Sequence, residues 1–165
     1  MAQDTRLALE RFVETEYPAV VAAVGLITGN REEADDAVQD ALVGYLARPP
    51  KRQVTNVAAW ITVVASNRAR DRHRSRAAER RAYARLSPAV EATTDVSETV
   101  DTDVLAALAE LPLGQRQVCV LHYLLDQSVA DIAEGLRVST GTVKTQLHRA
   151  RTALAARLSR EDHHG

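Results

Sequence analysis

Apolar side chains recur along this chain with the spacing of amphipathic helices, and hardly any stretch alternates as a half-buried strand would. Pro18 is typical of a first helical turn, and Pro49 with Pro50 ends a helix. Asn30, followed three residues later by Glu33, predicts a helix start of the capping-box kind. Predicted helices cover residues 5–16, 18–28 and 31–47, and a fourth starts near Val57. The pattern predicts an all-α fold.

The helical periodicity fails for a stretch in the middle of the chain. Residues 87–100, SPAVEATTDVSETV, are rich in Ser, Thr and acidic side chains, which is typical of a linker. Periodicity resumes near residue 102. We therefore expect two helical domains, 5–86 and 102–160, joined by a flexible acidic linker over 87–101 and without a fixed relation to each other.

The net charge of −1 conceals blocks of opposite sign. Residues 48–85 contain eleven basic and two acidic side chains, whereas residues 1–47 have a net charge of −6. Residues 137–160 contain six basic side chains and no acidic one. Such blocks indicate partners of different charge at different places, and the two basic blocks favour phosphate backbones.

The C-terminal domain contains a predicted helix-turn-helix: residues 128–136, a turn at 137–139 and a longer helix over 140–158. The apolar stripe of the longer helix consists of Val143, Leu147, Ala150, Leu154 and Leu158. Thr145, His148 and Arg149 point away from that stripe, and Lys144 and Arg151 flank it. A polar, cationic face without acid is what a helix needs to enter the major groove. The alternative is a helical hairpin with a solvated basic face.

The helix after Val57 carries arginine at every second position from Arg68 to Arg76. At about 100° per residue, this spacing spreads charge around the helix, so the segment cannot be fully packed. It favours contact with a nucleic-acid backbone, with Trp60 and Asn67 able to meet bases. The alternatives are a frayed helix end and a Trp60 that belongs to the core.

The acidic helix 31–47 has a packed face of Ala34, Val38, Ala41, Leu42 and Tyr45. Asp36, Gln39 and Asp40 lie on its opposite face. This face is either a docking surface for a basic protein partner or an ordinary solvated surface.

Signatures of catalysis are missing. The five histidines lack metal-ligand spacing, no phosphate-binding glycine loop is present, and Cys119 lies in an apolar helical pattern as an inert packed thiol. No catalytic residue, metal or cofactor is expected, and the chain is not expected to be an enzyme. Without a transmembrane run or a signal segment, we expect a cytoplasmic protein with no membrane insertion.

Several motifs resemble those of one bacterial family. They are LP-x-x-QR, S-x-x-x-IA and S-x-GTVK-x-x-L-x-RAR-x-x-L in the C-terminal domain, and TGN-x-EEADDAVQDAL with AW-x-x-x-VASN-x-A-x-D-x-x-R in the N-terminal one. In order and spacing they resemble regions 4 and 2 of sigma factors of the extracytoplasmic-function (ECF) group, within the sigma-70 family. Region 3 is absent between them, as in that group.

This resemblance implies roles that composition does not supply. Region 2 would dock on the clamp helices of the largest subunit of core RNA polymerase through Asp36, Gln39 and Asp40. It would read the promoter −10 element with the loop 49–56 and the following helix. The −10 residues are Trp60, Asn67, Arg68, Arg70, Arg72 and Arg74. The −35 residues, in region 4, are Thr142, Lys144, Thr145, His148, Arg149 and Arg151.

The further partners implied are the flap of the second-largest polymerase subunit, promoter DNA and a separate anti-sigma protein. Two other functions remain in view. One is a plain helix-turn-helix regulator, which would not need the acidic docking face or the arginine-rich helix. The other is a sigma mimic that sequesters an anti-sigma factor, and such mimics usually carry an additional receiver domain.

Overall fold

The computed structural model describes residues 2–51, 54, 56–83 and 102–162, and every element within these ranges is helical. In chain order the helices are α1 (Ala2–Arg11), α2 (Tyr17–Thr28), α3 (Arg31–Ala47), α4 (Val57–Tyr83), α5 (Thr102–Glu110), α6 (Leu113–Cys119), α7 (Val129–Leu136) and α8 (Thr140–Asp162). Two π-helical turns, η1 (Phe12–Glu16) and η2 (Val120–Leu124), continue α1 and α6. The all-α prediction is confirmed, while the predicted linker lies outside the described residues.

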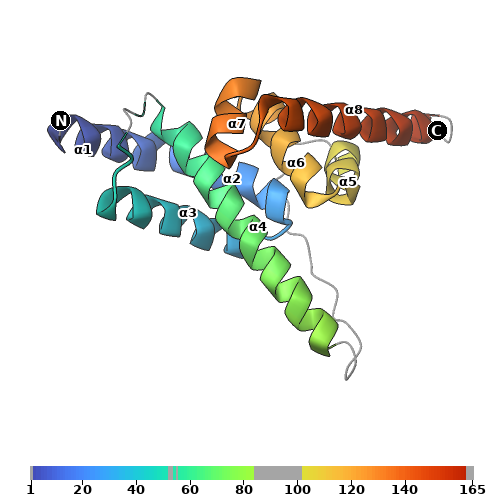
Figure 1. Cartoon of the computed structure of the whole chain (residues 1–165), viewed down its shortest axis with the longest axis horizontal. Helices are drawn as coiled ribbons and strands as arrows, with labels where there is room; N and C mark the ends of the chain where they lie inside the picture. Colours follow the sequence, from blue (N-terminus) through green and yellow to red (C-terminus); the bar gives the residue numbers. More distant parts are fainter. Residues whose placement is uncertain (1, 52–53, 55, 84–101, 163–165) are drawn as a thin grey trace.

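The N-terminal half is built around α2, α3 and α4, which pack against one another (Figure 1). Phe12, Val24, Val38 and Ile61 are fully buried at its centre. On α3 the buried face consists largely of small side chains, Ala34, Ala37 and Ala41. Because these residues lack bulk, α2 and α4 can approach α3 closely. Each fully buried Val or Ile stabilises the fold by roughly 1.5–3 kcal/mol.

The turn between α2 and α3 follows from two residues. Gly29 has a φ of 75°, in the left-handed region that favours glycine. Asn30 Oδ1 then accepts hydrogen bonds from the N–H groups of Glu32 (2.9 Å) and Glu33 (3.2 Å). The predicted N-cap is confirmed. The second hydrogen bond of a capping box, from the Asn30 N–H to the Glu33 side chain, is replaced by one to Thr28 Oγ1.

The C-terminal half contains the predicted helix-turn-helix. Ser128 Oγ caps α7 by accepting a hydrogen bond from the Asp131 N–H at 3.0 Å. Arg137 ends α7 with a φ of 59°. Ser139 Oγ caps α8 through the Thr142 N–H at 3.0 Å. These two caps and the left-handed residue between them set the sharp change of direction between α7 and α8.

The stripe predicted for α8 faces the core of this half. Val143, Leu147 and Ala150 are buried, and Leu154 is half-buried. They pack with Val118, Leu121 and Ile132 from α6, η2 and α7, or with Leu108 of α5 and Leu111, which directly follows α5. An ion pair between Arg157 and Glu110 also joins α8 to the end of α5.

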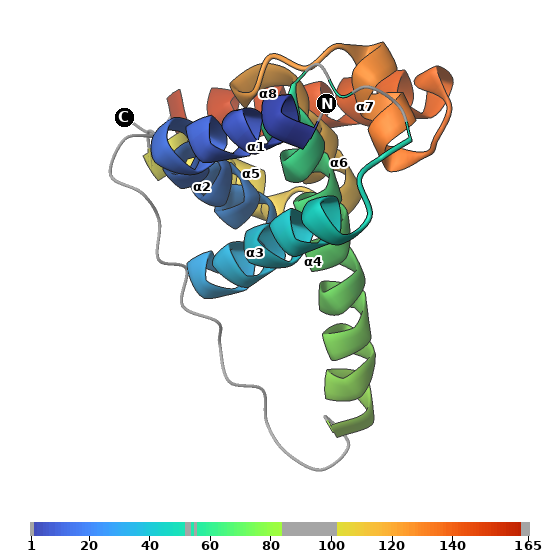
Figure 2. The same cartoon turned by 90° about the vertical axis from the view of Figure 1, so that its left-hand side faces the viewer.

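The two halves pack against each other in this structure, whereas the sequence pattern had suggested no fixed relation between them. Figure 1 shows α6 and α7 against the first part of α4, and Figure 2 shows the second part of α4 extending away from the body. Val63 of α4 belongs to the apolar cluster of the C-terminal half, and Val120 of η2 packs with Ala23 and Ile27 of α2. The sequence pattern had assigned each apolar stripe to its own half and missed those that are shared.

Candidate nucleic-acid and protein interfaces

The outward face of α8 is polar and basic, opposite the buried stripe. Lys144, Thr145, His148, Arg149 and Arg151 are all exposed there. Thr142 is exposed too, but its Oγ1 lies 2.8 Å from Ser139 Oγ, so its hydroxyl takes part in the cap of α8. The sequence has no acidic side chain between residues 140 and 160. The face therefore offers donors and positive charge to an anionic partner.

The arginines of α4 divide between two sides of the helix. Arg68, Arg72 and Arg76 lie on the side that faces α3. Arg68 Nη1 donates to the Asp40 carbonyl at 3.2 Å, Arg72 pairs with the Asp40 carboxylate, and Arg76 pairs with Glu33. Two groups predicted for different partners, Arg72 for DNA and Asp40 for polymerase, thus bind each other in this structure.

On another side of α4, Asn67 and Arg70 face the C-terminal half. Gln117 of α6 is fully buried and donates through Nε2 to Ser66 Oγ at 2.9 Å and to Asn67 Oδ1 at 3.5 Å. Arg70 Nη1 donates to Gln117 Oε1 at 3.4 Å. Burial lowers the pKa of Arg70, and the charge of Arg74 lowers it further. Arg74 itself is exposed.

Trp60 packs on the core of the N-terminal half. Its ring meets Tyr45 edge to face, with centroids 5.1 Å apart and planes at 68°. It is half-buried, so part of the ring is still accessible. The structure thus gives Trp60 a packing role, and contact with a base stays a prediction.

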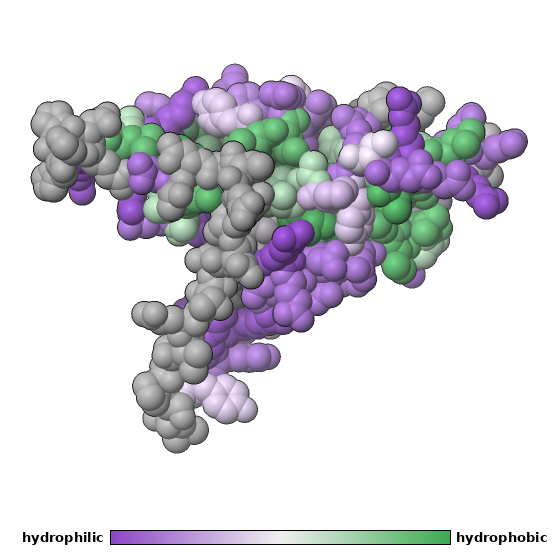
Figure 3. All heavy atoms as spheres, turned by 180° about the vertical axis from the view of Figure 1, so that it is seen from behind, coloured by the Kyte–Doolittle hydropathy of each residue, from purple (hydrophilic) through white to green (hydrophobic). Residues whose placement is uncertain are grey.

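The acidic face of α3 continues into an apolar one. Asp36 and Gln39 are exposed, and Asp40 is half-buried beside Arg72. Val43 and Leu46, further along the same helix, are 64% and 65% exposed. Figure 3 shows a hydrophobic area over the C-terminal part of α3. Leu46 was missed in the sequence, although its spacing of three residues from Val43 places both on one side of a helix.

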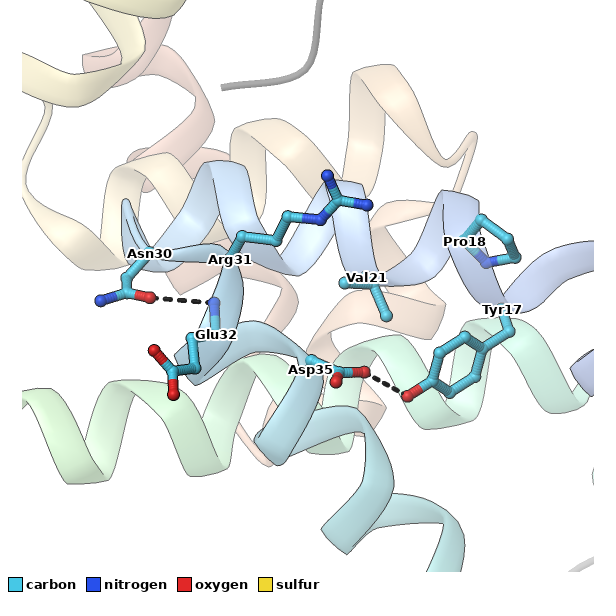
Figure 4. A pocket seen from close by; sticks show the side chains of 7 residues that line it. All are labelled: Tyr17, Pro18, Val21, Asn30, Arg31, Glu32 and Asp35. Carbon is cyan, nitrogen blue, oxygen red and sulfur yellow. Dashed lines mark hydrogen bonds between the residues drawn. The ribbon is translucent and has the colours of Figure 1, made fainter. Parts of the chain in front are cut away.

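A shallow cavity of about 780 Å³ flanks the start of this face (Figure 4). It is lined by Tyr17, Pro18, Val21, Asn30, Arg31, Glu32 and Asp35. The Tyr17 hydroxyl donates to Asp35, whose other carboxylate oxygen accepts from Gln39 Nε2 at 3.3 Å. Burial raises the pKa of Tyr17, and the hydrogen bond to Asp35 raises it further. Gln39 is therefore held in place by groups that sequence reasoning did not identify.

Within the described parts of the chain, no three His, Cys, Asp or Glu side chains are placed to hold a metal ion. The Cys119 thiol is buried, and this burial raises its pKa. The His122 ring nitrogen Nδ1 lies 2.8 Å from the Gln127 carbonyl oxygen. None of the described helices is long and apolar enough to span a bilayer.

The C-terminal half is a helix-turn-helix with a basic face that lacks acidic side chains. It packs on a second helical half that contains an arginine-rich helix. These features are typical of DNA-binding transcription proteins. Comparison with known families agrees. The family described as "Sigma-70 region 2" matches residues 12–79, and "Sigma-70, region 4" matches residues 101–154.

Curated relatives match along most of their length. The ECF RNA polymerase sigma factor SigM of Mycobacterium tuberculosis is 30% identical over 91% of this chain and 76% of the relative. SigL of the same species is 33% identical over 89% and 87%. The chain therefore belongs to the extracytoplasmic-function group of the sigma-70 family. It binds RNA polymerase and directs the initiation of transcription, and sigma factors are regulatory proteins rather than enzymes.

Solved structures agree with this fold. The sigma factor RpoE of Bartonella quintana, in complex with the anti-sigma factor NepR, superposes with a TM-score of 0.71 at 24% identity. The alignment covers 92% of this chain and 96% of that one. CnrH, in complex with the cytosolic domain of CnrY, superposes with a TM-score of 0.61 at 26% identity, over 94% and 89% of the two chains.

Proposed function

We propose that this sigma factor recognises a two-part promoter, with α8 at the −35 element and α4 at the −10 element. The observation that carries the proposal is the exposed, acid-free face of α8 within a capped helix-turn-helix. Lys144, Thr145, His148 and Arg149 would meet base edges in the major groove. Thr142 and Arg151 would approach phosphates.

At the −10 element, we assign Asn67 to an unstacked base and Arg68, Arg70, Arg72 and Arg74 to phosphates. Opening the duplex costs stacking energy, which captured bases and phosphate contacts offset. Arg74, being exposed, is available without rearrangement. The other three must first leave Asp40 or Gln117.

For core RNA polymerase, we propose that Asp36, Gln39 and Asp40 meet the clamp helices of the largest subunit. Val43 and Leu46 extend that surface with apolar area. A partner surface with basic and apolar side chains in the same order would complement it. The C-terminal half would meet the flap of the second-largest subunit.

We further propose control by a separate anti-sigma protein, because the sigma factor RpoE of Bartonella quintana, which has a similar fold, was solved in complex with the anti-sigma factor NepR. The proposed function consists of binding to polymerase and DNA and breaks no covalent bond, so no catalytic residue, cofactor or metal is proposed. Its place would be the cytoplasm, where the polymerase and the chromosome are.

The test is transcription in vitro with purified protein, bacterial core polymerase and genomic DNA, followed by mapping of transcript starts. Starts that share paired −35 and −10 elements would support the proposal and supply the promoter sequence. A folded protein that binds core and yields no starts would favour the sigma mimic. Failure to bind core would favour the plain DNA-binding regulator.

A further inference from the structure

The cavity between α2 and α3 combines apolar surface, an aromatic ring and two acidic side chains. Val21 is buried beneath it, and Pro18 adds a second apolar surface. Tyr17 is half-buried at one end, while Glu32 and Asp35 supply two carboxylates (Figure 4). A cationic group on an aliphatic stem fits this combination, because the stem covers apolar surface while the charge meets the acids.

The two carboxylates have acceptor capacity left for a partner. Asp35 accepts one hydrogen bond from the Tyr17 hydroxyl and one from Gln39 Nε2 at 3.3 Å. An ionised carboxylate has about four acceptor sites, so about two remain on Asp35. Glu32 is exposed, and within the described part of the chain its side chain forms no hydrogen bond or ion pair. Both acids can therefore bind further donors.

Arg31 determines which end of the cavity attracts a cation. Figure 4 shows its guanidinium on the side of Val21 that is away from Asp35. Among the described residues, no ion pair joins Arg31 to Glu32 or to Asp35. The two acids are thus not neutralised from within the cavity. A cation is attracted to their end and is repelled from the end that holds Arg31.

The cavity continues the surface proposed to dock on polymerase. Gln39, assigned to that surface, holds Asp35 through its side-chain amide. Asp36, also assigned to it, follows Asp35 directly in α3 and is exposed. Asp35 and Gln39 are four residues apart, about 6 Å along the helix axis. A partner that lies along this face of α3 therefore reaches the cavity with one side chain.

We propose that the cavity is a subsite for an arginine side chain of core RNA polymerase. The inference rests on the docking function proposed above for α3. The planar guanidinium stacks on the Tyr17 ring and donates hydrogen bonds to Asp35 and Glu32. The aliphatic stem lies on Pro18 and Val21. A lysine ammonium has neither a plane to stack nor a fixed fork of donors, so the site prefers arginine.

The first test removes the two charges while it retains the shape of both side chains. Glu32→Gln/Asp35→Asn keeps an acceptor oxygen for the Tyr17 hydroxyl and should weaken binding of the full chain to core polymerase by about tenfold or more. Asp4→Asn/Glu14→Gln is the matched control, because it removes the same charge at exposed positions of α1 and η1. Equal losses in the two variants would indicate attraction by net charge alone and would overturn the inference.

The aromatic ring is tested by a pair of variants at one position. Tyr17→Phe keeps the ring, whereas Tyr17→Leu keeps only apolar bulk. Both lose the hydroxyl that donates to Asp35, so a difference between them reports on the ring. Core affinity should be several-fold higher for Tyr17→Phe than for Tyr17→Leu, because phenylalanine also stacks with a cation. Equal affinities would overturn the stacked geometry.

Small probes distinguish arginine from lysine without the polymerase. N-acetyl-arginine amide and N-acetyl-lysine amide are titrated separately into the chain, and the Tyr17 ring signals are followed by NMR. The arginine probe should shift these signals at concentrations at which the lysine probe does not, and Glu32→Gln/Asp35→Asn should abolish the shift. Equal shifts with both probes, or none, would overturn the preference for arginine.

The two readouts together separate the cavity from the docking function. Arginine binding to the cavity, combined with unchanged core affinity in Glu32→Gln/Asp35→Asn, would overturn polymerase as the occupant. If the wild-type chain does not bind core at all, the docking function proposed for α3 fails as well. Loss of core binding in Asp36→Arg but not in Glu32→Gln/Asp35→Asn would leave the docking face in place and exclude the subsite.

Discussion

Arg116 illustrates how much a single side chain contributes to this fold. Its guanidinium donates to the carbonyls of Ile27 (2.9 Å), Ala109 (3.0 Å) and Leu111 (3.0 Å). These carbonyls lie at the ends of α2 and α5, where intrahelical partners run out and positive charge is favoured. Burial lowers the pKa of Arg116. A residue of the LP-x-x-QR motif therefore joins three helices, and two of its bonds are local to the C-terminal half.

The −35 assignment is tested at single positions of α8. Arg149→Ala should weaken binding to the mapped −35 duplex by about 1–3 kcal/mol if Arg149 contacts a base with two hydrogen bonds. Arg160→Ala removes the same charge from the same helix, beyond the proposed reading face, and is the control. Affinities measured by fluorescence anisotropy should separate the two. Equal, small losses would indicate phosphate attraction instead of base reading.

Tyr17 predicts a pH dependence of stability. The folded chain raises the phenol pKa above its ordinary 10.0, so it holds the proton more tightly than the unfolded chain. The free energy of unfolding should therefore be unaffected by this group below that pH and fall as pH rises from 10.0 toward the raised value. Urea unfolding between about pH 8 and 11 should show a smaller decline in Tyr17→Phe.

The control for this effect is Tyr83→Phe, because Tyr83 is 70% exposed. At neutral pH, Tyr17→Phe should also cost about 1 kcal/mol through loss of the bond to Asp35. Identical alkaline profiles in wild type and Tyr17→Phe would contradict the prediction.

At the scale of one element, α4 binds different neighbouring helices on two of its sides. Its arginines at positions 68, 72 and 76 bind α3, while Asn67 and Arg70 bind α6. The distribution of charge around the helix was predicted from the spacing. Which side meets which neighbour depends on where the other helices lie, and that is absent from the local pattern.

The proposed polymerase-docking face of α3 is tested by reversing one of its charges. Asp36→Arg should reduce binding to core polymerase by about tenfold or more, because reversing a charge at a complementary interface adds repulsion. The melting temperature should change little, since Asp36 is exposed. Glu14→Arg makes the same charge change in η1, away from this face. Retained co-purification of Asp36→Arg with core would exclude the face as a docking surface.

At the scale of the whole molecule, the halves share buried residues and should unfold together. Trp60 is the only tryptophan in the sequence and reports on the N-terminal half, whereas circular dichroism reports on helices of both. In urea the two signals should give coincident transitions. Gly135→Ala should separate them, because its Cβ would lie 2.5 Å from Val63 Cγ1 of α4 and so disturb the contact, while Ala favours the helix α7 itself. Separate transitions in the wild type would show that the halves are energetically independent.

Much of the fold was predictable because its signals are local. Asn30, Ser128 and Ser139 each cap a helix whose start the sequence pattern predicted, and Asn30 was recognised as a cap, since a cap acts within three residues. The stripe of α8 was found because 3.6-residue periodicity is written in the sequence. The Tyr17–Asp35 bond was not found, because it joins residues 18 positions apart on two helices.

The sequence by itself determined the helices, their buried faces, the helix-turn-helix and the family, because each depends on neighbouring residues or on motif order. Only the tertiary structure decided that Arg72 binds Asp40 and that Gln117 lies between the halves. Such contacts depend on which helix faces are brought together across long separations in the chain. A pattern read along one helix contains the shape and charge of a face, but not the identity of its partner.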